Sequence, residues 1–403
     1  MRILKISDVF FPRVNGVSTS IETFRRDLVA LGHDVVLVAP AYSADSADPR
    51  EALNPSVRRV PSRAVPRDPE DRIMSFGGLR RALAEFAGSG GSPGPRFDVV
   101  HIHTPFLAHY AGLRFARAQC ILVVATYHTL FEEYLHHYVP LLPRAVTGRL
   151  ARRFSRSQCN RLDAVIAPSQ AMRQALLAYG INTRIDILPT GLPADRFQAG
   201  DGMAFRRRHG LALDRPLLLF VGRTAHEKNI GFLLEMMLEL RSQRPDALLL
   251  IAGEGPAAPS LRAQAAHLGL GESVRFLGYF DRGGELQDCY SAADVFVFSS
   301  LTETQGLVLL EAMAQGVPVV AIPRMGTIDI LGPGQGCRHA PNDRKGFARV
   351  VGDLLADRGG CRALGEQARE YAQTWASARM AQRLSDLYAS LAPAGGQGGR
   401  LVA

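Results

Sequence analysis

The sequence predicts an α/β protein built on parallel sheets. Short apolar runs, such as residues 217–221 and 294–298, alternate with segments whose apolar residues recur at helical spacing. At the N-terminus the order is strand, helix, strand over residues 2–40, which forms a right-handed parallel crossover. A length of 403 residues favours two or three domains.

Composition and charge narrow the class of protein further. Hydrophobic residues make up 47% and charged residues 21% of the chain, which is ordinary for a globular protein. A net charge of +9 favours acidic partners, namely nucleotide phosphates, anionic lipid surfaces or nucleic acid. The five cysteines lack metal-ligand spacing, which favours reduced thiols in the cytoplasm. We expect no signal peptide and no membrane span, because no run approaches about 18 apolar residues.

Two histidines fall where an N-terminal parallel sheet would bind a ligand. After the first strand (2–7), Ser18 or Thr19 is expected to cap a helix that runs to about Leu31. The preceding loop contains Gly16, which would let the backbone approach a ligand closely. His103 ends a strand at 97–103, and His128 follows a strand at 121–126. Further strands are expected at 33–40, 57–60, 163–167 and 185–188, with helices at 107–118 and 169–179.

A basic segment follows these strands. Between Tyr134 and Leu162 there is no Asp or Glu, and Tyr134 and Tyr138 add aromatic side chains to the same surface. On a helix, one face would carry Arg149, Arg152, Arg153 and Arg156, and the neighbouring face Val146, Leu150 and Phe154. This pattern favours a helix that lies on an anionic lipid surface. Binding of nucleic acid is not expected, because no RNP, KH or zinc motif accompanies the arginines.

The second half of the chain contains a second series of strands. We expect a hinge near Gly191, a first domain at 1–195 and a second at 196–376. The final helix, about 377–392, should return to the first domain, and 393–403 form a tail. Arg223 and Lys228 flank the turn after the strand at 217–223, where they would neutralise a diphosphate. Gly253 opens a glycine-containing loop after the strand at 247–253.

One motif outweighs the others in specificity. Glu303 lies in the loop after the strand at 294–298, and Glu311 lies in the helix that follows. A carboxylate can accept hydrogen bonds from two vicinal sugar hydroxyls, so this pair suits a sugar and a ribose. The backbone N–H groups of Gln305, Gly306 and Leu307 precede the helix, where they suit a phosphate.

The stretch TETQGLVLLEAMAQGVPVVA closely resembles the E-x7-E signature of retaining GT-B glycosyltransferases of family 4. The amino-acid sequence of this stretch is most similar to that of the branch that glucosylates diacylglycerol. The resemblance covers nearly the whole chain and implies the GT-B fold, with two Rossmann-like domains facing a central cleft. It implies transfer of a hexose from a nucleotide sugar to a lipid acceptor, with retention of configuration and without a metal or other cofactor. A peripheral enzyme at the inner face of the membrane is the corresponding expectation.

The resemblance also implies a role for individual residues. Glu303 would hold sugar hydroxyls, Glu311 the ribose, and Arg223 with Lys228 the departing diphosphate. Gly16 and Gly253 would face the donor, and His128, in the stretch TYHT, would lie beside sugar and acceptor. His103 is assigned to the acceptor side. Three alternatives are open: a GDP-mannose donor with a glycolipid or phosphoinositide acceptor, a soluble acceptor, and an inactive nucleotide-binding or membrane-tethering module.

Overall fold

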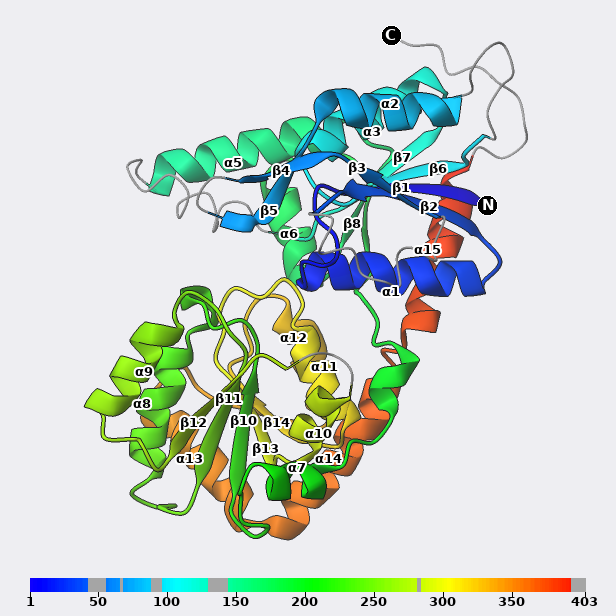
Figure 1. Cartoon of the computed structure of the whole chain (residues 1–403). Coiled ribbons are helices and arrows are strands. Elements are labelled where there is room, and N and C mark those ends of the chain that lie inside the picture. Colours follow the sequence, from blue (N-terminus) through cyan, green and yellow to red (C-terminus); the bar gives the residue numbers. More distant parts are fainter. Residues whose placement is uncertain (43–55, 66–67, 88–95, 130–143, 281–283, 393–403) are drawn as a thin grey trace. The chain divides into compact units, whose positions relative to one another are not determined.

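The computed structural model describes residues 1–42, 56–65, 68–87, 96–129, 144–280 and 284–392 (Figure 1). The chain divides into two compact units. The first comprises Met1–Gly191 together with Ser377–Ala403, and the second comprises Leu192–Ala376. The C-terminal helix therefore belongs to the N-terminal unit, and the two units are described separately below.

The N-terminal unit is built on a parallel sheet whose described strands follow the order β3-β2-β1-β6-β7-β8-β9. A separate antiparallel hairpin is formed by β4 and β5. The order reverses between β1 and β6, and open α/β sheets bind ligands at such a reversal, beyond the carboxyl ends of the strands. The strands are β1 (Arg2–Ile6), β2 (Asp34–Pro40), β3 (Val57–Val60), β4 (Ser62–Val65), β5 (Asp68–Met74), β6 (Val99–Ile102), β7 (Leu122–Thr126), β8 (Ala164–Ala167) and β9 (Ile185–Ile187).

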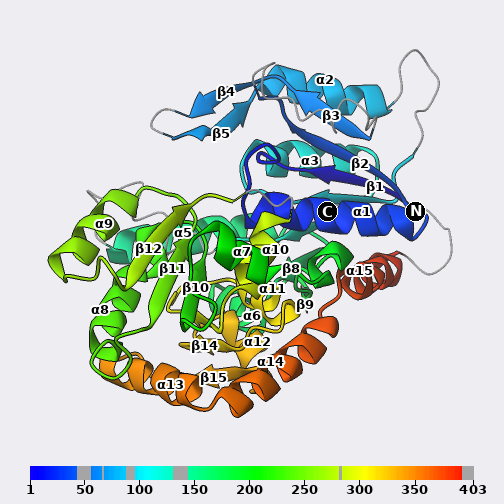
Figure 2. The ribbon, with the colours of Figure 1, turned by 60° about the horizontal axis from the view of Figure 1, so that its bottom comes forward.

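Helices cover this sheet, and one of them comes from the far end of the sequence. Helix α15 lies beside α1 in both ribbon views (Figures 1 and 2). Phe24 and Leu28 of α1 share a buried cluster with Leu384 and Tyr388 of α15. The helices are α1 (Gly16–Ala30), α2 (Phe76–Ala87), α3 (Leu107–Ala118), α5 (Arg144–Cys159), α6 (Gln170–Ala178) and α15 (Ser377–Leu391). None of the described helices combines the length and the apolar composition needed to cross a bilayer.

The start of α1 differs from the expectation. Asn15, not Ser18 or Thr19, is the N-cap, and its side chain accepts a hydrogen bond from the Ser18 backbone N–H at 2.8 Å. Ser18 and Thr19 are instead buried within the helix. An Asn is as good a cap as a Ser or Thr, so local preference alone does not choose among these positions.

The C-terminal unit has a second parallel sheet, with the described strands in the order β12-β11-β10-β13-β14-β15. The strands are β10 (Leu217–Val221), β11 (Leu248–Ala252), β12 (Val274–Gly278), β13 (Val295–Phe298), β14 (Val319–Ala321) and β15 (Cys337–His339). The α-helices are α7 (Gly202–Arg208), α8 (Ile230–Leu240), α9 (Ala258–His267), α10 (Glu285–Ser291), α11 (Leu307–Ala314), α12 (Thr327–Leu331), α13 (Arg344–Ala356) and α14 (Arg358–Gln373), and two short 3-10 helices are η2 (Ala194–Phe197) and η3 (His226–Lys228). The sheet strands β10, β11 and β13 are buried along their whole length, as the apolar runs predict.

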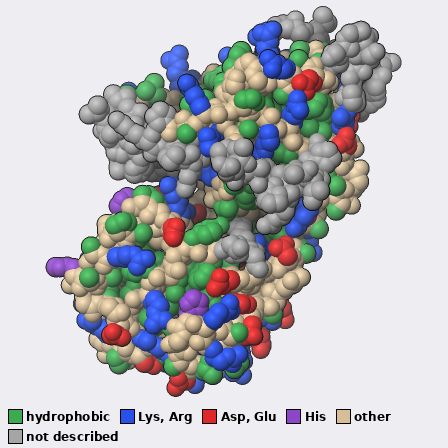
Figure 3. Space-filling model, viewed as in Figure 1, with side chains coloured by type: hydrophobic (Ala, Val, Ile, Leu, Met, Phe, Trp, Pro, Cys, Tyr) green, Lys and Arg blue, Asp and Glu red, His purple; other side chains and the backbone are tan. Residues whose placement is uncertain are grey.

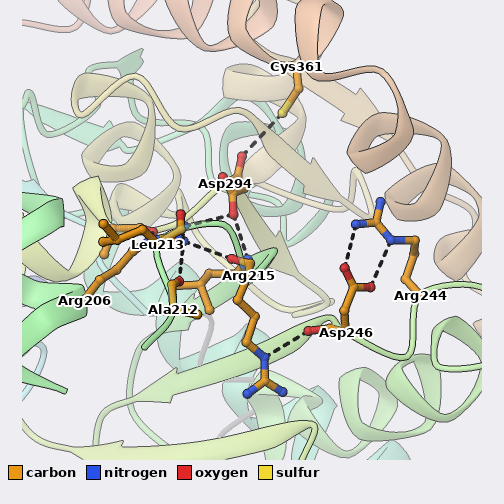
Figure 4. Close-up of polar contacts among 10 residues, drawn as sticks. Arg206, Ala212, Leu213, Arg215, Arg244, Asp246, Asp294 and Cys361 are labelled. Atoms are coloured by element: carbon orange, nitrogen blue, oxygen red, sulfur yellow. Dashed lines mark hydrogen bonds and ion pairs between the residues drawn. The ribbon is translucent and has the colours of Figure 1, made fainter. Parts of the chain in front are cut away.

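A buried arginine fastens α7 to this sheet (Figure 4). The Arg206 guanidinium donates to the backbone carbonyls of Ala212, Leu213 and Arg215, and it pairs with Asp294 at 3.0 Å. Asp294 also accepts from the Leu217 backbone N–H at 2.7 Å. The cluster therefore holds the beginnings of β10 and β13 together, which fixes the opposite, carboxyl ends of these strands where the candidate site lies.

Candidate functional site

Two glycine-containing loops interlock at the carboxyl ends of β10 and β11. The Gly222 N–H donates to the Ala252 carbonyl at 3.0 Å, and the Thr224 N–H donates to the Glu254 carbonyl at 2.9 Å. Gly253 has a φ of 134°, and a Cβ on it would lie 2.0 Å from the Gly222 carbonyl oxygen. Backbone thus packs directly on backbone, which only glycine permits. This packing by itself explains why position 253 requires glycine, without reference to any ligand of the loop.

Lys228 and Glu303 are brought together beyond the ends of β10 and β13. The Lys228 Nζ lies 2.5 Å from Glu303 Oε1, and both side chains are largely buried. Two serines hold the lysine turn against the glutamate loop: Ser299 Oγ donates to the Asn229 carbonyl at 2.9 Å, and Ser300 Oγ donates to the Glu227 carbonyl at 3.2 Å. Asn229, in the left-handed conformation (φ 55°), ends η3 and begins α8. The two loops that carry the ion pair are therefore joined to each other by hydrogen bonds.

The loop that carries Glu303 is shaped by two further glycines. Gly306, with a φ of 97°, turns the chain into α11 as the sequence predicts. The Gly326 N–H donates to the Glu303 carbonyl at 2.9 Å, and a Cβ on Gly326 would lie 2.0 Å from the Thr304 carbonyl oxygen. Gln305 in this loop is buried and Leu307 begins the helix. The turn after β14 thus supports the Glu303 loop from one side.

Glu311 lies on α11 as expected, and its side chain is buried. The Tyr290 hydroxyl, from α10, donates a hydrogen bond of 2.9 Å to Glu311 Oε2. A cavity of about 10 Å³ adjoins the pair and is lined also by Arg196, Gln287 and Gln315. Tyr290 therefore fixes one carboxylate oxygen of Glu311. The sequence contains no signal for this contact, because the two residues lie on different helices.

Arg223 follows Gly222 directly and its side chain is exposed. Its carbonyl accepts a hydrogen bond from the Ala225 N–H at 2.9 Å, which tightens the turn toward η3. Arg223 and Lys228 therefore leave the same short turn, as predicted. The exposed Arg223 guanidinium and the largely buried Lys228 ammonium lie at the ends of strands, where together they can hold an anionic group.

In the N-terminal unit, Gly16 opens α1. A Cβ on Gly16 would meet no atom within 4 Å, and its φ lies outside the left-handed region. Neither packing nor backbone conformation therefore requires glycine here, in contrast to Gly253. The prediction that Gly16 faces a ligand remains a prediction.

Three histidines line one face of the N-terminal sheet near its carboxyl edge. His101 and His103 are buried, and their ring centroids lie 4.1 Å apart. His103 Nδ1 lies 3.1 Å from Nε2 of His128, a residue of intermediate burial. The structure thus brings together the two histidines that the sequence places at adjacent strand ends. Of the three residues, His128 alone is of intermediate burial, and its ring contacts that of His103.

Burial keeps these rings neutral. It lowers the pKa of His101 and of His103 well below the ordinary value and the pKa of His128 to about 3. Lys5, beside His101 in the sheet register, is fully buried, and burial lowers its pKa to about 7. In the part of the chain that the structure describes, its Nζ has no hydrogen-bond partner, and it lies 5.5 Å from the centre of the Phe24 ring. Sequence reasoning missed Lys5, because one lysine in a strand gives no signal that its side chain is buried.

Helix α5 carries the basic face predicted from the sequence. The side chains of Arg149, Arg152, Arg153 and Arg156 are exposed, and so are those of Val146 (41%), Leu150 (51%) and Phe154 (37%). Figure 3 shows Lys and Arg side chains projecting from the N-terminal unit beside hydrophobic ones. Tyr134 and Tyr138, which were assigned to the same surface, lie outside the described residues.

The opposite side of α5 is anchored near the histidines. The Ser155 and Tyr127 hydroxyls lie 2.7 Å apart, and Gln158 Nε2 donates to the Pro105 carbonyl at 2.7 Å. Tyr127 directly precedes His128, and Pro105 follows the β6 end that carries His103. The basic helix is therefore attached to the same two strand ends as the histidine pair.

Comparison with known proteins gives consistent matches. The family model described as Glycosyl transferases group 1 matches residues 203–371, and that of Glycosyltransferase Family 4 matches residues 14–196. An alpha-monoglucosyldiacylglycerol synthase of Streptococcus pneumoniae is 32% identical over 329 residues, which are 80% of this chain and 71% of the synthase. A GDP-mannose-dependent alpha-mannosyltransferase of Mycobacterium tuberculosis is 31% identical over 343 residues, 83% of this chain and 82% of that enzyme. Among solved structures, Anabaena Alr3699/HepE in complex with UDP and glucose has a TM-score of 0.76 at 17% identity, covering 97% of this chain and 100% of that one.

Proposed function

This chain belongs to the family 4 glycosyltransferases and is a hexosyltransferase of the GT-B fold, and from that premise we propose that it transfers glucose from UDP-glucose to diacylglycerol at an anionic membrane surface. The observation that carries the proposal is the Glu303 and Glu311 arrangement with Lys228 and Arg223 at the strand ends. The similarity to the synthase of Streptococcus pneumoniae supports the choice of sugar and acceptor.

The C-terminal unit binds the nucleotide sugar in this proposal. Glu311 accepts hydrogen bonds from the ribose hydroxyls, and Tyr290 keeps its second oxygen occupied. Glu303 accepts from hydroxyls of the sugar. Lys228 and Arg223 neutralise the diphosphate, on which negative charge grows as the bond to the sugar breaks. Glu303, Lys228 and Arg223 come from turns held by backbone contacts and Glu311 from helix α11, so little reorganisation is needed when charge develops.

Transfer replaces one bond of the sugar by another. The bond between the anomeric carbon and the diphosphate oxygen breaks, and a bond from that carbon to the acceptor hydroxyl oxygen forms. The hydroxyl proton leaves with the diphosphate. His128 is a neutral imidazole because burial lowers its pKa to about 3, so it orients substrate oxygens without adding charge.

The N-terminal unit binds the acceptor and contacts the membrane in this proposal. The exposed arginines of α5 suit anionic headgroups, and the adjacent Val146, Leu150 and Phe154 suit the headgroup and acyl boundary. The side of α5 opposite this face is hydrogen-bonded to Tyr127, so the helix is attached to the strand end that carries His128.

A donor and acceptor panel tests the reaction. Purified protein is incubated with UDP-glucose or GDP-mannose and with vesicles of anionic phospholipid that contain diacylglycerol, and products are identified by mass spectrometry. We expect glucosyldiacylglycerol from UDP-glucose. Glu303→Gln is the inactive control. Mannosylated lipid as the main product would replace the proposed donor, and products formed only with soluble acceptors would replace the proposed acceptor.

A mannosyltransferase is the second candidate. It is favoured by the 31% identity to the GDP-mannose-dependent enzyme of Mycobacterium tuberculosis, which is spread over 83% of this chain. In that case the same carboxylates and cations would hold GDP-mannose, with a glycolipid or phosphoinositide as acceptor. Titration with UDP and with GDP discriminates the two, because the competing diphosphates differ only in the base.

The membrane contact is tested by reversing the charge of α5. Each cation near an anionic leaflet contributes about 1 kcal/mol, and the attraction decays over a Debye length of about 8 Å at physiological salt. Changing Arg149, Arg152, Arg153 and Arg156 together to Glu should abolish sedimentation with anionic vesicles and leave UDP binding unchanged. The matched control applies the same charge change to exposed cations of the other unit, Lys345, Arg349, Arg358 and Arg362. Equal loss in both variants, or no vesicle binding by the wild type at low salt, would refute an α5 membrane surface.

A further inference from the structure

In the histidine cluster of the N-terminal unit, His101 and His103 differ in how many of their ring nitrogens are hydrogen-bonded. His101 is fully engaged, with Nδ1 2.6 Å from the Tyr388 hydroxyl and Nε2 2.7 Å from the Thr126 hydroxyl. Among the described residues, His103 has only its Nδ1 hydrogen-bonded, by His128 Nε2 at 3.1 Å, and its buried Nε2 has no hydrogen-bond partner. His101 is therefore held by two hydroxyls, whereas the orientation of His103 is tied to His128.

The chemistry of two neutral imidazoles restricts where the protons lie. Each ring carries one N–H, and the contact between His103 and His128 requires a donor on one side and an acceptor on the other. If His128 donated from Nε2, the proton of His103 would lie on its buried, unpartnered Nε2. Among backbone groups, a buried N–H without an acceptor is rarer than a buried acceptor without a donor, and we apply the same preference to the imidazole nitrogens. The favoured state therefore has His103 donating from Nδ1 to Nε2 of His128.

In that state the remaining proton of His128 lies on Nδ1, the nitrogen that His103 does not contact. We propose that His103 is a positioning residue, which fixes the ring and the tautomer of His128 so that His128 offers an Nδ1–H to an oxygen of the bound substrate. The ligand class is a hydroxyl or a phosphate oxygen, because both accept a hydrogen bond. This inference rests on the proposed role of His128 in transfer, and it adds the direction of the hydrogen bond and the residue that sets it.

Paired amide variants test the proposal. Asn at position 103 can place an N–H near the position of Nδ1, whereas the longer Gln places its amide near Nε2. We expect His103→Asn to keep kcat within about threefold and His103→Gln to lower kcat roughly 10- to 100-fold, the range in which misplacement of a catalytic group falls. The KM for the nucleotide sugar should change less than kcat, because the nucleotide is held by residues of the other unit. His109→Gln is the matched control, since His109 is equally buried and also has an unpartnered Nε2.

A spectroscopic readout separates this inference from the proposed function. With ¹⁵N-labelled histidine, and with His128→Ala to identify the His128 signals, the ring shifts report which nitrogen carries the proton. Wild type and His103→Asn should show the Nδ1–H form of His128, and His103→Gln should lose it. The proposal is overturned if wild-type His128 is the Nε2–H form, if the tautomer is the same in all three proteins, or if both amide variants lower kcat equally. If no transfer is detected with any donor, the ring shifts still decide the tautomer.

Discussion

Lys228 Nζ and Glu303 Oε1 lie 2.5 Å apart, although 75 positions separate the two residues in the sequence. In the proposed mechanism the lysine serves the diphosphate and the glutamate serves the sugar. The two groups form an ion pair with each other. With the proposed roles, a bound nucleotide sugar would exchange this ion pair for two new contacts.

This exchange predicts an unusual response of Glu303→Gln. The variant no longer holds Lys228, so UDP without a sugar should bind about fivefold tighter, corresponding to about 1 kcal/mol for a partly screened pair. Glucose transfer should be strongly reduced, because the sugar hydroxyls lose a charged acceptor. Titration calorimetry with UDP measures the first effect. Glu227→Gln removes a neighbouring carboxylate as a control, and equal or weaker UDP binding by Glu303→Gln would show that the pair does not compete with the diphosphate.

Loss of the charge on Glu311 should weaken donor binding. Glu311→Gln keeps the shape of the side chain but replaces charged hydrogen bonds, at a cost of roughly 1–3 kcal/mol in binding. Tyr290→Phe, which removes the hydrogen bond to Oε2, should act in the same direction and less strongly. Because both changes affect one carboxylate, the double variant should lose less than the sum. Tyr371→Phe is the control, and unchanged UDP affinity in Glu311→Gln would remove Glu311 from the ribose site.

Arg223→Ala and Lys228→Ala should each lower turnover strongly, because the charge of the leaving diphosphate grows in the transition state. The double variant should cost less than the two single changes combined, since both cations act on one group. Initial rates at saturating donor measure the effect. Arg207→Ala, an exposed arginine on α7, should behave as wild type. A single variant with full activity would exclude that residue from diphosphate stabilisation.

Gly253→Ala tests the interlocked loops. The added Cβ would approach the Gly222 carbonyl oxygen to 2.0 Å at a φ of 134°, so either the loop shifts or strain of about 1–3 kcal/mol is stored. We expect a lower thermal midpoint and weaker UDP binding. Gly271→Ala is the matched control, because its Cβ would meet nothing within 4 Å. Equal midpoints for the two variants would contradict the packing described for Gly253.

Lys5 should make stability depend on pH in a definite direction. Its pKa falls from 10.5 in the unfolded chain to about 7 in the folded protein, so folding favours the neutral amine. The contribution of this group is most favourable above pH 10.5, is lost as pH falls toward 7, and is constant below 7. Lys5→Met should therefore be more stable than wild type by on the order of 3–5 kcal/mol at pH 6.5, with a smaller difference at pH 9.5. Chemical denaturation at both values checks this, and a difference that does not vary with pH would contradict a buried, unpartnered amine.

The sequence by itself predicted most strands and helices of the two parallel-sheet units and the residues at their strand ends, but not the β4/β5 hairpin or α2. Alternation of buried runs with amphipathic segments is local information, so it placed Glu303 in a loop, Glu311 in the following helix and His128 after a strand. The resemblance of the E-x7-E string added the family, which the comparisons confirm. The arginine face of α5 could also be predicted from the sequence, because helical periodicity decides which side chains share a face.

The tertiary structure alone decided which distant residues meet. Lys228 pairs with Glu303, and His103 with His128, because parallel strands end at the same edge of their own sheet. Tyr290 pairs with Glu311 because α10 packs beside α11, and sequence separation carries no record of these contacts. Burial likewise follows from the packed fold, so the shifted pKa values of Lys5 and the histidines had no signal in the chain. The same applies to Asn15, which caps α1 in place of Ser18 or Thr19, since equal local preferences are resolved only when the loop before the helix is placed.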